Sequence, residues 1–136
     1  MNRSLGGALL AGIALSLSAC QSPTAPPTPV GGGKSAALRN MEQVATSAYQ
    51  CWFASNDSAF RDYSFANELN SFSGRPRFLL VPKGNYGGRP LLVVQAEGAA
   101  GQVTSFGPLL DGPHAARISA DINRWASGNG GCAGAA

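Results

Sequence analysis

The sequence is poor in charged residues, which make up 12% of its 136 positions, about half the share of an average soluble protein. Ten Lys and Arg stand against seven Asp and Glu, which gives a formal net charge of +3. The cations form no dense run of the kind that nucleic-acid-binding tails and patches contain. We therefore expect no nucleic-acid partner.

The sequence also has few of the groups that enzymes use for catalysis. Its single histidine, His114, has no G-x-S-x-G serine to accompany it, so the signature of a serine hydrolase is missing. Asp57, Asp62 and Glu68 are close in sequence, but their spacing does not require them to meet. One histidine and a few distant cysteines are too few ligands for a metal site. We expect no metal, no cofactor and a non-catalytic protein, with a small hydrolase or redox enzyme of unknown substrate as the alternative.

No apolar run is long enough for a permanent transmembrane helix. An uncharged stretch begins at Leu5 and ends at Leu17, and a helix over residues 5–19 would rise about 22 Å, short of the roughly 30 Å hydrocarbon core of a bilayer. Arg3 precedes this stretch and small residues follow it. This is the layout of a secretory signal peptide.

The end of that segment, Leu17-Ser18-Ala19-Cys20, resembles the lipobox of bacterial lipoproteins. The resemblance implies that residues 1–19 are removed and that the thiol and new amino group of Cys20 are acylated. The lipid would then hold the protein on a membrane of the cell envelope. Gln21 follows, where Asp tends to retain lipoproteins in the inner membrane. The resemblance therefore favours the outer membrane, facing the periplasm, over the inner membrane.

Residues 20–34 predict a tether between the lipid and a folded domain. This segment contains four prolines and three glycines and only one charged residue. Such a composition gives an extended or flexible spacer, which at about 3.1 Å per residue reaches roughly 40 Å at most.

Residues 35–132 predict one small domain, followed by a tail over residues 133–136. Ser35 is a suitable N-cap for a first helix, which we expect to end near Asn56 and Asp57. Apolar residues recur at helical spacings of three and four along its core face: Leu38, Met41, Ala45, Ala48 and Trp52. For residues 57–70 the sequence is compatible with either a strand or a short helix, and both alternatives stay open.

The middle of the domain predicts an antiparallel meander of three or four strands. Residues 77–81 and 91–96 are rich in branched side chains, and residues 102–107 complete a hairpin with the second of them. A last helix, opened by residues 111–113 and ended by Gly128, carries a second apolar stripe: Ala115, Ile118, Ile122 and Trp125. The expected fold is α+β, with the helices at its two ends.

Two cysteines remain once Cys20 is assigned to lipid. Cys51 belongs to the first helix and Cys132 follows the last, and an even pair beyond a secretory signal favours a disulfide. Such a bond would join the domain's first and last elements and stabilise it by about 4–5 kcal/mol in the chain-entropy model. A redox pair or metal ligands are the alternatives.

Four of the ten cations fall within fifteen residues. Arg75, Arg77, Lys83 and Arg89 border the predicted strands, and Arg makes bidentate contacts with anions. The pattern suggests a site for an anionic envelope polymer, a lipid phosphate or an acidic envelope protein. Protection of strand edges and ordinary solubility explain the same residues. We expect a membrane-anchored envelope lipoprotein with a binding or structural domain, and the alternative enzyme would be periplasmic.

Overall fold

Two helices and a four-stranded antiparallel sheet make up the part of the chain that the computed structural model describes, residues 33–133. These residues lie within one compact unit. The elements are α1 (Ala36–Ala48), a π-helical turn (Tyr49–Ala54), a 3-10 turn (Ser58–Phe60), β1 (Tyr63–Glu68), β2 (Arg77–Pro82), β3 (Leu92–Glu97), β4 (Gln102–Phe106), a second 3-10 turn (Pro108–Asp111) and α2 (Ala115–Ala126). The predicted α+β fold is confirmed.

The predicted signal peptide (1–19) and Cys20 lie outside the described residues. So do most of the predicted tether (20–34) and all but the first residue of the predicted tail (133–136).

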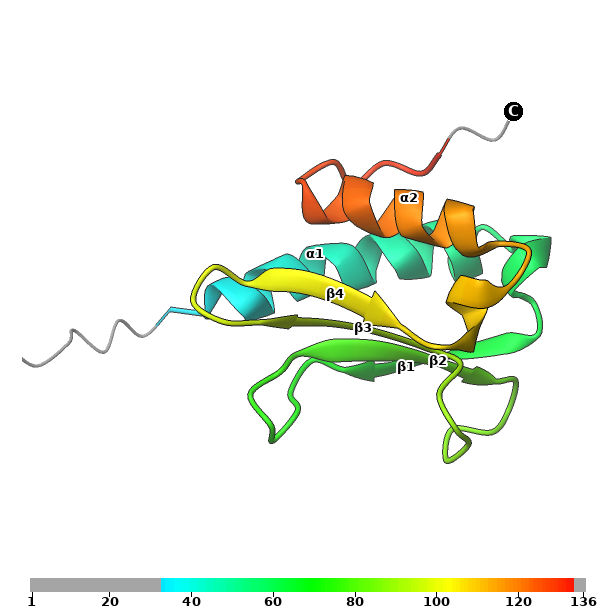
Figure 1. The fold of residues 1–136 in the computed structure, drawn as a ribbon, viewed down its shortest axis with the longest axis horizontal. Helices are drawn as coiled ribbons and strands as arrows, with labels where there is room; N and C mark the ends of the chain where they lie inside the picture. The colour runs from blue at the N-terminus through cyan, green and yellow to red at the C-terminus, as the bar shows by residue number, and fades with distance from the viewer. Residues whose placement is uncertain (1–32, 134–136) are drawn as a thin grey trace, which may run out of the picture. The chain divides into compact units, whose positions relative to one another are not determined.

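The sheet is a meander of four strands in the order β1-β2-β3-β4, each antiparallel to its neighbour. Both helices cover one face of it (Figure 1). Alternate residues of the central strands face them, so that Phe78, Leu80, Leu92 and Val94 join the core beneath the helices. The core therefore sits between the sheet and the helix pair.

The other face of the sheet carries no helix (Figure 1). Leu79, Val81 and Val93 form a second, smaller buried cluster there, as the period of two along a strand requires. Ala66 packs against it, and Phe106 is in register with Val93. We call this surface the open face.

The first helix begins where the sequence predicts. The Ser35 hydroxyl accepts a hydrogen bond from the backbone N–H of Leu38 at 3.1 Å, which satisfies one donor of the first turn. Met41, Ala45 and Ala48 are buried as expected, whereas Leu38 is only half-buried. Val44, which the predicted stripe omitted, is buried instead, because the apolar face is wider than a single row of residues.

The segment after α1 resolves the alternative left open for residues 57–70. Asp57 caps the 3-10 turn by accepting a hydrogen bond from Ala59 N at 3.0 Å, and β1 begins three residues after Phe60. Residues 57–70 thus contain both a short helical turn and a strand.

The last helix starts later than the sequence predicts. Asp111 ends a 3-10 turn, Gly112 is extended, and α2 begins at Ala115 with His114 as its N-cap residue. Pro113 therefore precedes the helix and does not occupy its first turn. At the other end Gly128 has φ of +98°, in keeping with the predicted stop at a glycine with positive φ.

Candidate functional site

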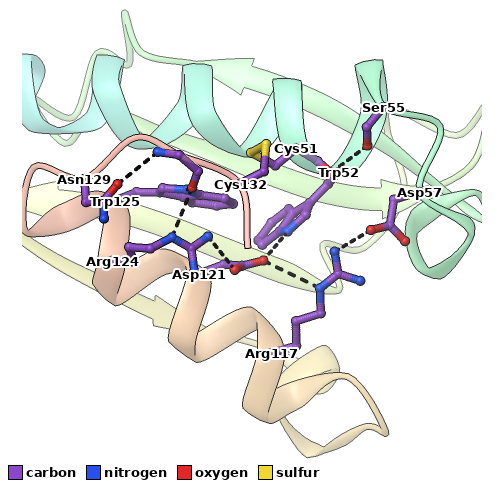
Figure 2. Close-up of a disulfide and its surroundings, with 11 residues drawn as sticks. Cys51, Trp52, Ser55, Asp57, Arg117, Asp121, Arg124, Trp125, Asn129 and Cys132 are labelled. Carbon is purple, nitrogen blue, oxygen red and sulfur yellow. Dashed lines mark hydrogen bonds and ion pairs between the residues drawn. A yellow bond between two sulfur atoms is a disulfide. The ribbon is translucent and has the colours of Figure 1, made fainter. Parts of the chain in front are cut away.

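The predicted disulfide is present and joins the two ends of the domain. Cys51 and Cys132 are 81 residues apart in sequence, and their Cα atoms lie 5.3 Å apart. Cys51 belongs to the π-helical turn and is buried, whereas Cys132 follows α2 and is exposed. Figure 2 shows the bond beside a group of charged side chains from α2 and from the segment after α1.

The C-terminal end of α2 positions Cys132. Gly128 N donates to the carbonyl of Trp125 at 3.0 Å and Asn129 N to that of Arg124 at 3.1 Å, the pair of bonds that defines a Schellman cap. The chain turns back at this point. The carbonyl of Gly131 then accepts bonds of 3.0 Å from both Trp125 Nε1 and Arg124 Nε, which fixes the residue before Cys132.

Asp121 is the buried centre of the charged group. Its side chain is 2% exposed and accepts a hydrogen bond of 2.8 Å from Trp52 Nε1 and another of 2.7 Å from Arg124 Nη2. Arg117 lies one helical turn earlier in α2, and its Nε is 3.7 Å from Oδ2 of Asp121. A buried carboxylate is tolerated only when it is paired and hydrogen-bonded, and these three partners meet that requirement.

Arg117 connects this centre to the segment after α1. Its Nη2 donates a hydrogen bond to Asp57 Oδ2, and its guanidinium carbon lies 5.5 Å from the ring centre of Phe60. The hydrogen bond from Arg117 lowers the pKa of Asp57, and the Ala59 N–H and the charge of His114 act in the same direction against desolvation. The same bond with Asp57 raises the pKa of Arg117.

Asp57, Arg117 and Asp121 line an open cavity of about 580 Å³ beside the disulfide. Its lining residues are Cys51, Ser55, Asp57, Arg117, Asp121, Cys132 and Ala133. The charges are already satisfied by one another, and no buried side-chain nitrogen or oxygen atom in residues 33–133 lacks a hydrogen-bond partner. We therefore interpret the network as a structural support for the disulfide and for the packing of the two helices.

His114 is exposed and is not among the residues that line this cavity. Its side chain makes no capping hydrogen bond at the start of α2. Residues 33–133 also contain no cluster of His, Cys, Asp or Glu that could hold a metal ion, and neither of their helices is long and apolar enough to cross a bilayer.

The four predicted anion-binding cations lie toward the two ends of β2. At its start, Arg77 Nε pairs with Glu68 at 2.6 Å and Arg75 Nε with Glu97 at 3.0 Å. Past its other end Lys83 and Arg89 are exposed and, within the described chain, make no ion pair. The structure thus brings them onto one strand and its loops but does not gather them at a single point.

Asp121, Arg117 and Arg124 were not predicted from the sequence. A signal was present, because Asp121 is three residues from Ile118 and four from Trp125 and so shares their apolar face. Trp52 and Trp125, which the sequence places on the two apolar stripes, are both buried, and their ring centres lie 5.0 Å apart.

Comparisons of this chain with protein-family models, with curated proteins and with solved structures found no match.

Proposed function

We propose that this protein is a bacterial envelope lipoprotein, held on a membrane by lipid at Cys20, whose folded domain has a non-catalytic binding or structural role in the periplasm. The observation that carries the proposal is the segment Leu17-Ser18-Ala19-Cys20 at the end of the thirteen-residue uncharged stretch that begins at Leu5. Each buried methylene adds about 0.8 kcal/mol, so that two or more acyl chains give stable membrane attachment.

The disulfide supports the same compartment. Structural disulfides persist in oxidising environments such as the bacterial periplasm and are rare in the cytosol. The bond between Cys51 and Cys132 ties the π-helical turn that follows α1 to the segment after α2. A domain exported by a signal peptide would meet conditions in which this bond forms.

The arrangement of charged groups supports a role in binding or architecture. Asp57, Arg117, Asp121 and Arg124 neutralise one another, whereas a catalytic acid or base needs a pKa matched to proton transfer and access to its substrate. The exposed cations of the β2–β3 loop are more suitable contact residues.

Mass spectrometry of the full chain, expressed in a Gram-negative host, tests the proposal. The mature protein is expected to begin at an acylated Cys20 and to fractionate with membranes. Cys20→Ser is expected to abolish cleavage and acylation, while Ala19→Gly, which keeps a small residue before the cysteine, is expected to mature normally. A wild-type chain that retains residues 1–19 with an unmodified Cys20 would refute the proposal.

A second variant tests which membrane holds the protein. Separation of inner and outer membranes is expected to place the wild-type chain in the outer-membrane fraction. Gln21→Asp is expected to shift it to the inner membrane, without changing acylation. Recovery of the wild type in the inner membrane would contradict the outer-membrane assignment and leave the lipid anchor standing.

A further inference from the structure

Two loops extend from the sheet on the side opposite the helices. They are the β1–β2 loop (69–76) and the β2–β3 loop (83–91), and both project past the open face in Figure 1. Each carries a large exposed aromatic residue: Phe72 is fully exposed and Tyr86 is 66% exposed. Phe106, on the open face itself, is 51% exposed. Aromatic residues therefore occur on both loops and on the sheet surface between them.

The positive charge of the domain is concentrated on the same part of the chain. Residues 68–97, which include β2 and both loops, carry four cations and two carboxylates. The remainder of residues 33–133 carries five cations and five carboxylates and is neutral. The backbone N–H of Lys83 donates a hydrogen bond of 2.9 Å to the backbone carbonyl of Asp62. The side chains of these two residues nevertheless form no ion pair.

We propose that the open face and its two loops dock on an anionic lipid bilayer, with Phe72 and Tyr86 at the headgroup level and Lys83 and Arg89 against lipid phosphates. Aromatic side chains suit this level because they present an apolar ring to the lipid. Basic residues near an anionic membrane each contribute about 1 kcal/mol of attraction. This inference rests on the proposed lipid anchor, which holds the domain near the bilayer.

The spacing of the cations favours an extended surface over a small anion. β2 has six residues, so its ends lie about 17–20 Å apart, with Arg75 beyond one end and Lys83 beyond the other. A single phosphate group cannot contact both. A bilayer presents many headgroups and can contact both loops at once, and it also accommodates the exposed rings, which a purely anionic polymer does not.

Fluorescence of single tryptophan replacements in the acylated full-length protein tests the orientation. Phe72→Trp and Tyr86→Trp report on the two loops, and Tyr49→Trp is the matched control, because Tyr49 is 53% exposed on the turn that extends α1. The native Trp52 and Trp125 are buried and give a common background. Each variant is reconstituted into phosphatidylcholine vesicles with or without phosphatidylglycerol, the acyl chains being brominated near the headgroups.

In vesicles with phosphatidylglycerol, we expect bromolipid to quench the introduced indole of Phe72→Trp and of Tyr86→Trp, but not that of the control. We expect a marked loss of this quenching without phosphatidylglycerol or at about 1 M salt, where the screening length falls to roughly 3 Å. The double substitution Lys83→Gln and Arg89→Gln is expected to reduce quenching, whereas Lys34→Gln with Arg39→Gln, an equal change of charge at exposed positions at the start of α1, is not.

Three outcomes would overturn the inference. Equal quenching of the control and the loops would mean that the anchored domain has no preferred orientation. Quenching independent of phosphatidylglycerol would remove the phosphate contacts. Absence of loop quenching, with retention of the protein on an immobilised anionic cell-wall polymer, would assign the face to that polymer. All three outcomes are measured on protein that mass spectrometry has shown to be acylated. A failure of the docking proposal is therefore distinguishable from a failure of the lipid-anchor proposal.

Discussion

The indole nitrogen of Trp52 donates a hydrogen bond of 2.8 Å to the carboxylate of Asp121, and both side chains are buried. The bond joins residues 69 positions apart, one in the π-helical turn and one in α2. It places a negative charge inside the core between the two helices. The arginines on either side of Asp121 in α2 make that charge tolerable.

We predict that Asp121→Asn destabilises the domain by about 2–3 kcal/mol. This is below the roughly 3–5 kcal/mol for breaking a fully buried ion pair, because the side chains of Arg124 and Arg117 are 24% and 40% exposed and can reach water. Urea unfolding followed by tryptophan fluorescence measures the change. Asp111→Asn, at an exposed site, is the matched control and is expected to change stability little; equal effects of the two would contradict the proposed role of Asp121.

The pair formed by Asp57 and Arg117 predicts a pH dependence. The lowered pKa of Asp57 in the folded state means that its stabilisation is present above the unfolded value of about 3.9 and is lost as the pH falls through the folded value. Asp57→Asn should therefore cost about 1–2 kcal/mol at pH 7, and progressively less below pH 4. This is below the roughly 1.5–3 kcal/mol of a hydrogen bond to a charged group, because the Arg117 side chain is 40% exposed and solvent screens the pair.

Urea denaturation of the wild type and of Asp57→Asn between pH 7 and pH 3 tests this expectation. Asp62→Asn, an exposed carboxylate in the same segment, is a suitable control. A constant difference between wild type and Asp57→Asn across this range would show that charge on Asp57 does not contribute to stability.

Reduction of the bond between Cys51 and Cys132 is predicted to lower the melting temperature by on the order of 10–20 °C, from a loss of about 2–4 kcal/mol. Differential scanning calorimetry with and without reductant measures the shift. A chain carrying both Cys51→Ser and Cys132→Ser should melt at the reduced temperature and respond to no reductant. An unchanged melting temperature in wild-type protein whose thiols are shown to be free would refute the stabilising role.

The β3–β4 turn offers a matched pair of glycines. Gly98 and Gly101 have φ values of +75° and +66°, and a Cβ atom at Gly98 would meet nothing within 4 Å. At Gly101 it would lie 2.6 Å from the carbonyl carbon of Ala36, at the start of α1. Gly98→Ala should cost about 1–2 kcal/mol through its backbone conformation, and Gly101→Ala distinctly more. Thermal unfolding compares them, and equal losses would show that the contact with α1 yields easily.

Local patterns predicted most of this fold because each depends on a few neighbouring residues. Ser35 caps α1, and the apolar stripe around Ile118 and Ile122 lies in α2. The disulfide followed from the parity of the cysteines. The bond between Trp52 and Asp121 had no such local basis, because it depends on how α1 and α2 pack.

The candidate site was predicted only in part for the same reason. Arg77 and Glu68 are nine residues apart, and they pair because the β1–β2 register places them opposite each other. The sequence marked Arg77 as a candidate for anion binding but could not supply this partner. Likewise, the π-helical turn that contains Cys51 and Trp52 departs from the 3.6-residue period of an α-helix. The sequence gives no local signal for this change, because the turn contains no glycine or proline.

The simple strand order has a consequence for how the chain reaches its final state. Every strand pairs with its neighbour in sequence, so the sheet closes through short hairpin connections, which form faster than distant contacts. Cys51 and Cys132 approach one another only after α1 and α2 have both docked. The native bond therefore depends on both helices being in place, and a chain that ends before residue 132 leaves Cys51 without its partner.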